Sequence, residues 1–362
     1  MKNNLDKNIK ITKKKIFNKD GSDELQNSDI LRNQNTNIIN VLDSKYPWIE
    51  DFYYVLTGNM WFPEKVDLSG DYIKDLNHKE YQAFKNVLSA LTAQDSIQAN
   101  ILGEPTYDNF LNDSGIAQIF AILRFQEVIH ARSYSTMALT FITNEKERHE
   151  LFYKWQNNQC FKDKLSNIAE HYQNFTSNPC LETMYLSVIN SLVLESILFY
   201  SGFYFFYNFM YSNVLNGVAD MIKLIHRDEY SHFLWFMKIK NILDTEYSKE
   251  IKNIYHLNKK IDKIFTDAIN FETNWFKELI GDSIRNFSIG DMENFIKFLC
   301  DQRRSVIGLK KLYPGVKNPI KFLTDIISVE KDDSLNKIGF FESNVTSYNH
   351  PTVIKDWSSL DK

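Results

Sequence analysis

The sequence predicts an all-α protein built around a bundle of long helices. Glycine and proline are scarce, at 12 and 7 of 362 residues, so few positions favour turns or interrupt helices. Apolar residues make up 43% of the chain, which is enough for a large buried core. These apolar positions recur with the spacing of a helix face, and no strand-rich block stands out.

Helical periodicity predicts six helical segments, at residues 79–102, 115–142, 183–212, 216–243, 247–280 and 291–311. Residues 1–35 are polar and rich in Asn and Lys, and we expect them to form a mobile arm. The helical domain is expected over residues 36–325. Residues 326–362 lose the periodicity and are expected to form a flexible tail.

Charge and cysteine content argue against several classes of protein. The formal net charge of −4 offers no basic surface for nucleic acid. The N-terminus has no apolar stretch of the kind found in signal peptides, and the three cysteines form no C-x-x-C pair. One uncharged run, residues 196–219, is long enough to cross a membrane, but its Tyr, Ser and Asn residues favour a buried core helix. We therefore expect a cytoplasmic protein that binds neither nucleic acid nor membrane.

An acid followed by a Glu-x-x-His motif occurs twice in the predicted helices. The first set is Asp95, Glu127 and His130, and the second set is Glu195, Glu229 and His232. In both sets the acid precedes its motif by nearly the same number of residues. Two helix pairs of matching length would therefore bring all six side chains to one level of the bundle.

This spacing has a chemical reason. Residues three apart on a helix share a face, so a Glu and a His at this spacing can bind one metal ion together. Ferritin-like bundles hold two ions with a carboxylate from each of two helices and a Glu-x-x-His motif from each of two others. The match predicts a ferritin-like helical bundle with a dimetal-carboxylate centre. Four carboxylates and two imidazoles suit iron or manganese, whereas no cysteine is present to favour zinc.

The alternative for any single member of the set is a buried ion pair. Three of the eight histidines follow an acid by three residues, and one of these, His78, lies in a polar stretch that we interpret as a solvated helix start. The helices around His130 and His232 are strongly apolar, so an unpaired Glu and His would be costly to bury there. Six such residues in a paired pattern favour a metal centre over separate ion pairs.

Tyr134 lies four residues after His130 and therefore on the same helix face, about one turn from the predicted metals. A buried tyrosine is most often core packing. Beside a dimetal site that activates oxygen, it becomes a candidate for one-electron oxidation to a stable radical. Such a radical requires a dry, apolar pocket, which Phe199, Phe203 and Ile225 are expected to line.

The chain resembles the small, radical-generating subunit of class I ribonucleotide reductase from about residue 45 to its end. The motifs are WFPEKVDLS (61–69), TAQDSIQ (92–98), FQEVIHARSY (125–134), LESILFYSGF (194–203), LIHRDEYSH (224–232) and FFESNVTSY (340–348). The resemblance implies that two Fe or two Mn ions bind the six ligands. It also implies that Tyr134 forms a radical, which a separate large catalytic subunit uses to reduce ribonucleotides to deoxyribonucleotides.

The resemblance further implies a route for radical transfer. Trp61 matches the tryptophan of this route, and Asp228 matches the acid that links the tryptophan to His130. Tyr348 is our choice for the tail tyrosine that relays the radical to the large subunit, which would bind the end of the tail. Each also has a simpler interpretation: Trp61 as core packing, Asp228 as a helix-surface pair, and Tyr348 as one of 19 tyrosines.

The subclass is left open by mixed features. The HARSYS and FYSGF stretches resemble class Ib proteins, which take two manganese ions with help from a flavodoxin-like activator. The KIFNKDGSDE and YPW segments resemble other bacterial or viral members. Tyr134 disfavours the mixed Mn/Fe form, in which phenylalanine replaces the radical tyrosine. In every case the resemblance implies a homodimer that binds a large subunit.

Two other functions are compatible with a dimetal bundle. One is an oxidase that acts on a bound lipid-like ligand, but such relatives usually have Glu at the position of Asp95 and lack the tail. The other is ferritin-like metal storage, but those chains are about half this length and lack the motif around Trp61. A fatty acid beside the metals would favour the first, and a large hollow oligomer would favour the second.

Overall fold

The structure, a computed structural model, describes residues 9–24, 29–40, 44–282 and 284–320. Within these ranges the secondary structure is helical, and the only strand-like pairing is an isolated bridge between Lys10 and Cys180. The predicted all-α fold is confirmed. The α-helices are α1 (Trp48–Gly58), α2 (His78–Ala99), α3 (Ser114–Phe141), α4 (Glu145–Tyr153), α5 (Gln159–Ser177), α6 (Leu181–Val193), α7 (Tyr200–Tyr211), α8 (Asn216–Glu246), α9 (Ser248–Lys252), α10 (Leu257–Leu279) and α11 (Ile289–Val306).

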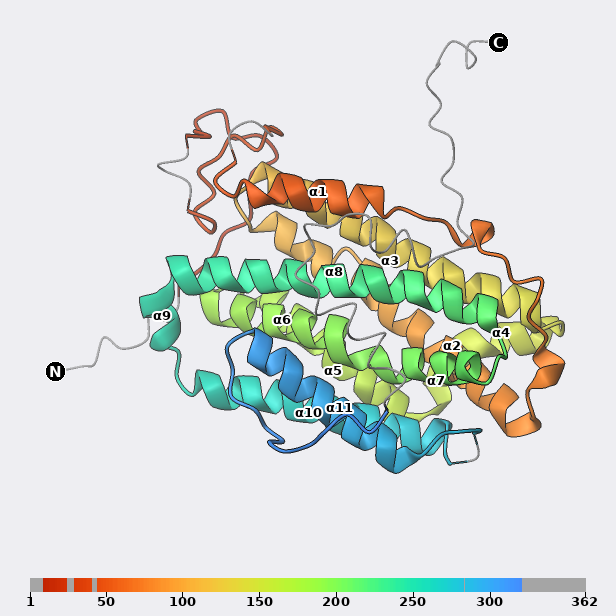
Figure 1. The fold of residues 1–362 in the computed structure, drawn as a ribbon. Helices are drawn as coiled ribbons and strands as arrows, with labels where there is room; N and C mark the ends of the chain where they lie inside the picture. Colours follow the sequence, from red (N-terminus) through yellow and green to blue (C-terminus); the bar gives the residue numbers. More distant parts are fainter. Residues whose placement is uncertain (1–8, 25–28, 41–43, 283, 321–362) are drawn as a thin grey trace, which may run out of the picture.

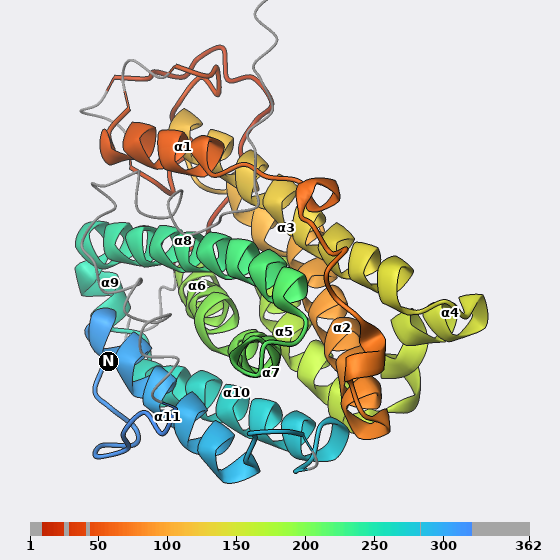
Figure 2. The same cartoon turned by 45° about the vertical axis from the view of Figure 1, so that its right-hand side comes forward.

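Helices α6 and α7 form the centre of the bundle. A short π-helix, Leu194–Leu198, joins them (Figure 1). Turned by 45°, the bundle shows α6 and α7 surrounded by α8, α2, α5, α10 and α11 (Figure 2). Among the described residues, Leu181–Tyr211 is the one helix long and apolar enough to cross a membrane, and 94% of its apolar window is buried inside the bundle. The uncharged run of the sequence is thus the core of the fold.

Local sequence signals fix where the site-bearing helices begin. The Asn77 side chain accepts the backbone N–H groups of Lys79 and Glu80, and the Glu80 carboxylate accepts the backbone N–H of Asn77. This reciprocal cap starts α2. Asp113 caps α3 with its side chain, which accepts two backbone N–H groups. These caps set the depth at which each helix presents its side chains to the core.

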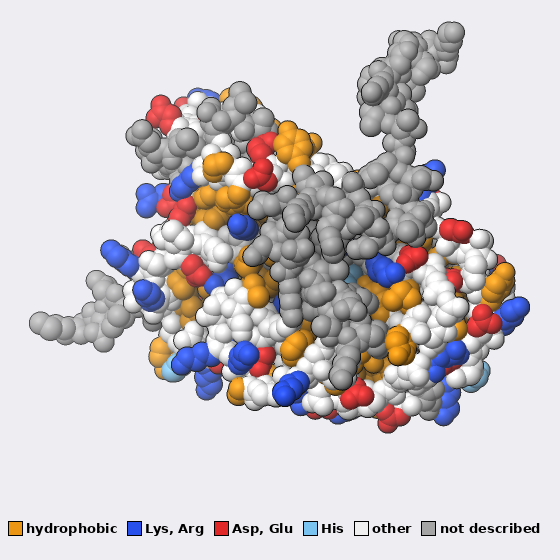
Figure 3. All heavy atoms as spheres, in the orientation of Figure 1, with side chains coloured by type: hydrophobic (Ala, Val, Ile, Leu, Met, Phe, Trp, Pro, Cys, Tyr) orange, Lys and Arg blue, Asp and Glu red, His pale blue; other side chains and the backbone are white. Residues whose placement is uncertain are grey.

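Close packing between α2 and α7 depends on Gly202. A Cβ atom built on Gly202 would lie 2.9 Å from the Cδ2 atom of Leu91. Leu91 is one helical turn before Asp95, so the missing side chain brings the Asp95 helix against the centre of the bundle. The described surface drawn in Figure 3 carries acidic and basic side chains interspersed, in keeping with the small net charge.

The structure differs from the sequence prediction in several elements. Helices α1, α4 and α5 were not predicted, and the segment expected over 247–280 divides into α9 and α10 at His256, which has a positive φ of 55°. Residues 9–24 and 29–35 of the predicted arm lie against the helical body, where Ile11 and Ile30 are buried. The backbone N–H of Ile30 donates to the Glu246 carboxylate at 3.0 Å. Mobility of the arm and of the tail stays a prediction, and residues 321–362 lie outside the described ranges.

Candidate metal centre

Four helical segments bring the six candidate ligands together in the core. Each side chain is at most 1% exposed. The ligands are Asp95 from α2, Glu127 and His130 from α3, Glu195 from the π-helix, and Glu229 and His232 from α8. The two Glu-x-x-His motifs are therefore on facing helices, as the template of the sequence analysis requires.

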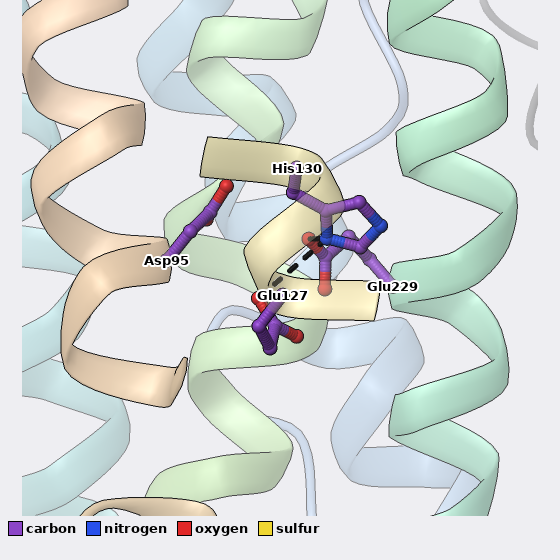
Figure 4. Close-up of side chains that lie close together, drawn as sticks. All are labelled: Asp95, Glu127, His130 and Glu229. Carbon is purple, nitrogen blue, oxygen red and sulfur yellow. Dashed lines mark ion pairs between the residues drawn. The ribbon is translucent and has the colours of Figure 1, made fainter. Parts of the chain in front are cut away.

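The six residues form two overlapping groups of ligand atoms. The first group is Asp95, Glu127, His130 and Glu229 (Figure 4), and the second is Glu127, Glu195, Glu229 and His232. Within each group the ligand atoms lie within 4.8 Å of one another. Glu127 and Glu229 belong to both groups, so these two carboxylates are placed to bridge a pair of ions.

The contacts of the shared carboxylates support this arrangement. Glu127 offers Oε2 to His130 Nδ1 at 3.5 Å and Oε1 to His232 Nδ1 at 2.9 Å. Glu229 offers Oε1 to His130 Nδ1 at 3.1 Å and Oε2 to His232 Nδ1 at 3.4 Å. Each carboxylate therefore directs one oxygen toward each imidazole, which is the geometry of a carboxylate that spans two metal ions.

Both histidines are oriented by a partner on the outer side of the ring. His130 Nε2 lies 3.3 Å from Asp228 Oδ2, and His232 Nε2 lies 3.1 Å from Gln126 Oε1. Both partner atoms are acceptors, so each Nε2 carries the proton and donates it. The Nδ1 atom of each ring is then directed into the centre, where its lone pair becomes available to a metal once any proton on it is displaced.

The residues fit two divalent cations. The buried carboxylate oxygens of Asp95, Glu127 and Glu229 have no hydrogen-bond partner among the described residues, and neither do the Nδ1 atoms of His130 and His232. Four buried carboxylates face only two imidazoles, so the cluster has an excess of acidic groups, which is strongly unfavourable to bury, whereas cations between them would remove the cost. Oxygen and imidazole donors without thiolate suit iron or manganese.

Mutual repulsion and burial shift the protonation of the cluster. Burial, followed by the charges of Glu127 and Glu229, raises the pKa of Asp95 well above its usual range. Although burial alone would lower it, the pKa of His232 is raised to about 10 by the carboxylates of Glu127 and Glu229. His232 therefore holds a proton at neutral pH in the metal-free protein, and Asp95 keeps its proton to a higher pH than an ordinary carboxyl, so a cation must displace protons from the cluster.

Metal affinity is therefore expected to rise with pH. A cation binds the deprotonated forms, so affinity should increase about tenfold per pH unit for each proton displaced near neutrality. Calorimetry of Mn²⁺ binding in two buffers with different ionisation enthalpies measures this proton release directly. Asp95→Asn serves as a control that should release fewer protons. Binding without proton release would contradict the protonation assigned to Asp95 and His232.

Tyr134 and Trp61, predicted from motifs, each lie beside a candidate ligand, Tyr134 beside Asp95 and Trp61 beside His130. Tyr134 is fully buried, and its hydroxyl has no hydrogen-bond partner among the described residues. Burial and then the neighbouring Asp95 charge raise the pKa of Tyr134. Trp61 is 1% exposed and donates its Nε1–H to Asp228 Oδ2 at 2.7 Å.

The remaining predicted residues are placed with less detail. Phe199, Phe203 and Ile225 are buried, and the first two rings stack with centroids 5.9 Å apart. Whether they line a pocket around Tyr134 stays a prediction. Tyr348 lies outside the described residues.

Sequence reasoning missed Glu104, a buried carboxylate beside Glu195. Glu104 is 2% exposed, and it accepts the hydroxyl of Tyr172 at 3.1 Å. Burial raises the pKa of Glu104 to about 7. Gln98 was missed as well, and its Nε2 donates to Glu195 Oε1 at 2.5 Å. Gln98 lies three residues after Asp95, a spacing that could have indicated it, whereas Glu104 lies in a short 3-10 turn without any periodic signal.

Comparisons with known proteins agree on one family. A family model described as "Ribonucleotide reductase, small chain" matches residues 38–319. The chain is 30% identical over 346 residues to a ribonucleoside-diphosphate reductase subunit beta of Halalkalibacterium halodurans, covering 93% of this chain and 96% of that protein. A relative of the same name from Treponema pallidum is 29% identical and covers 96% of this chain and 97% of its own length. The solved R2 subunit from Clostridium botulinum has a TM-score of 0.82 at 28% identity, covering 88% of this chain and 99% of that one.

Proposed function

The chain belongs to the ribonucleotide reductase small-chain family, and from this premise we propose how its own residues carry the activity. Members of this family are the small subunits of ribonucleoside-diphosphate reductase, an oxidoreductase that also needs a large subunit. One-electron oxidation of a tyrosine is the chemistry that the loaded dimetal centre supplies in this family. The observation that carries the proposal is the closed set of six buried ligands with two shared carboxylates.

The six ligands would hold two Fe or two Mn ions. Asp95 and His130 would bind one ion and Glu195 and His232 the other, and Glu127 and Glu229, which belong to both groups, would be shared between them. A mixed Mn/Fe pair is disfavoured by the presence of Tyr134. The flavodoxin-like activator and the cytoplasmic location stay predictions from the sequence.

Tyr134 is the residue that carries the radical. Its hydroxyl is buried beside Asp95, and its raised pKa keeps it protonated until an electron is removed. Because the Tyr134 side chain is 0% exposed, bulk water does not reach the hydroxyl. A phenoxyl radical in such surroundings has no nearby solvent to reduce it, which supports a long lifetime.

Trp61, Asp228 and His130 form the route by which the radical leaves the centre. Asp228 Oδ2 accepts from the Trp61 indole at 2.7 Å and from the His130 imidazole at 3.3 Å. Arg227 donates to the other oxygen, Oδ1, at 3.1 and 3.2 Å. Although burial acts to raise it, the Arg227 charge and these donors lower the pKa of Asp228. The carboxylate therefore stays ionised and couples the indole to the metal ligand.

Trp61→Phe is expected to separate radical formation from turnover. The variant loses the indole donor to Asp228 but keeps all six ligands, so the loaded protein should still form a tyrosyl radical. Reduction of ribonucleotides with the large subunit should be lost. Electron paramagnetic resonance (EPR) measures the radical, and a deoxyribonucleotide assay measures turnover.

Trp235→Phe is the matched control, because Trp235 is equally buried and its Nε1 lacks a described partner. If wild-type protein with iron or manganese, oxygen and reductant formed no radical, the proposed function itself would fail.

We propose that the homodimer expected for this family forms through the outer face of α3. A stripe at helical spacing on this face includes Phe125, Val128 and Leu139, whose exposed fractions are 45%, 41% and 68%. Between them, small side chains of α2 and α3 line a shallow groove: Thr92, Ser96, Ala131 and Ser135. An exposed apolar stripe of this kind is typical of an interaction surface, and a twofold axis would pair it with its own copy.

Leu139→Glu is expected to convert the dimer to a monomer. The change places a carboxylate in the apolar stripe, where the partner's carboxylate would also be buried. Sedimentation velocity should report the mass of one chain rather than two. Thr140→Glu, at the exposed neighbouring position, is the control and should leave the dimer intact. A dimer that persists in Leu139→Glu would place the interface elsewhere.

A further inference from the structure

The π-helix that carries Glu195 is an irregular turn inside an otherwise continuous helix. Residues Leu194–Leu198 interrupt the run from α6 to α7, and Glu195 is the second residue of this turn. A π-turn inserts an extra residue into the helix, which displaces backbone groups from the regular hydrogen-bond ladder. A regular helix would present Glu195 in another direction. The turn must therefore be held by interactions from outside the helix.

The carbonyl of Leu198, the last residue of the turn, receives two side-chain donors. Gln94 Nε2 donates to it at 3.1 Å, and Lys164 Nζ donates to it at 3.3 Å. Gln94 comes from α2 and Lys164 from α5, so two separate helices hold one carbonyl. Both donors are fully or nearly fully buried, at 0% and 1% exposure.

Lys164 is itself fixed by a carboxylate from a third helix. Its Nζ lies 2.5 Å from Glu272 Oε2, and both side chains are 1% exposed. Glu272 also accepts the hydroxyl of Ser201, which lies just beyond the turn on α7. The Lys164 ammonium lies over the Trp275 ring, 4.8 Å from its centroid. The ion pair thus ties α5 and α10 to both ends of the Leu198–Ser201 segment.

Stability alone does not account for this pair. Burying two charges costs solvation free energy, and apolar replacements of similar volume are often neutral or stabilising. Among the described residues the pair contacts Leu198, Ser201 and Trp275 and none of the candidate ligands, so it has no direct share in binding metal. Its contacts converge on the irregular turn that carries Glu195.

We propose that Lys164, Glu272 and Gln94 are positioning residues, which hold the π-turn and so direct the Glu195 carboxylate into the second group of metal ligands. The inference rests on the proposed function in one respect, namely that Glu195 is a ligand. Because Glu195 belongs to only one of the two ligand groups, loss of these positioning residues should lower the affinity for one ion only. A purely structural role would instead change the stability of the metal-free protein or weaken both ions equally.

The test is the paired variant Lys164→Met/Glu272→Gln, which removes both charges at nearly constant volume. Mn²⁺ binding to the metal-free dimer is followed by calorimetry and by the EPR signal of free Mn²⁺. One of the two affinities is expected to fall about 10- to 100-fold, the range for partners that orient metal ligands, while the other is unchanged. Unchanged affinities, or equal losses at both ions, would overturn the proposal.

Hydrogen exchange of the metal-free protein gives a second readout that needs no metal. Residues 194–202 should exchange faster in the variant, with little change in the midpoint of thermal unfolding. Hydrogen exchange tests the positioning role even if the wild-type protein binds no metal. Failure of the wild-type protein to bind metal would refute the proposed function and not the positioning role. Wild-type exchange rates over 194–202 in the variant would overturn the proposal.

The control is Lys85→Met/Glu147→Gln, which removes another ion pair between a buried lysine and a second helix. Lys85 lies ten residues before Asp95 on α2, so the pair is about 15 Å along the helix from the centre. Both affinities and the exchange of residues 194–202 should stay at wild-type values. Gln94→Met removes one neutral donor to Leu198, and we expect it to lower the affinity for the same single ion by a smaller factor. This variant replaces the paired variant if the latter does not fold.

Discussion

Replacing Tyr134 with phenylalanine is expected to abolish the tyrosyl radical while both metal ions stay bound. Phenylalanine has no hydroxyl proton to lose, so it cannot form the phenoxyl radical that the family uses. The change keeps the buried ring and removes only the hydroxyl beside Asp95, so the fold and the six ligand side chains should be retained. EPR after loading and oxygen exposure should show no tyrosyl signal, and ribonucleotide reduction with the large subunit should be lost.

Tyr185→Phe is the matched control for this experiment. Tyr185 is also buried, at 4% exposure, and its hydroxyl donates to Asp244 rather than facing the centre. The control should keep the radical and the activity. Metal analysis of both variants should give the wild-type content. A full radical signal in Tyr134→Phe would show that another tyrosine carries it.

Replacing Glu229 with glutamine is expected to remove both metal ions. Glu229 belongs to both ligand groups, so its loss weakens each ion, and an amide cannot supply two anionic oxygens. Replacing a residue that only orients a metal ligand lowers metal affinity about 10- to 100-fold. Loss of a ligand shared by both groups should therefore lower the affinity for both ions by more than this. Metal content after gel filtration measures the effect. The metal-free form should also lose stability, because Glu229 is attracted to His130 and its pKa is lowered in the fold, although burial opposes this.

Asp95→Asn gives the contrasting result. Asp95 belongs to one group only, so the ion of the other group should be retained. The pKa of Asp95 is raised by burial and repulsion, so the charged form is unfavourable in the metal-free fold. Removing the charge should therefore raise the free energy of unfolding without metal, measured by urea titration. Equal losses of metal in both variants would contradict the bridging role of Glu229.

The helical fold and the convergence of the six candidate ligands could be predicted from the sequence because they depend on period and spacing. The Glu-x-x-His pairs need only a regular helix to face one way, and α3 and α8 are regular through both pairs. The predicted starts of α2 and α3 are within about one residue of the observed ones, where the Asn77 and Asp113 side chains cap the helices. Such features are local, and local chemistry determines them.

Features that depend on distant partners could not be predicted. The apolar stripe of α5 contains Lys164 at a buried position, which weakens its helical pattern until Glu272 is known to pair with it. The π-turn at Glu195 has no periodic signature, since the residues around it are buried on every face, serines included. The first part of the chain is polar in composition, yet Ile11 and Ile30 find buried places on the helices. In each case a tertiary contact decides the structure.

The complete enclosure of the six ligands also has a kinetic consequence. Iron and manganese both suit carboxylate and imidazole donors, so equilibrium affinity discriminates weakly between them when both are present. With every ligand at most 1% exposed, an ion can enter or leave only when the helices part transiently. Exchange is then limited by the opening of the protein rather than by the strength of the metal–ligand bonds. The metal in a given molecule would then depend on which ion was available during loading, and it would stay in place until the bundle next opens.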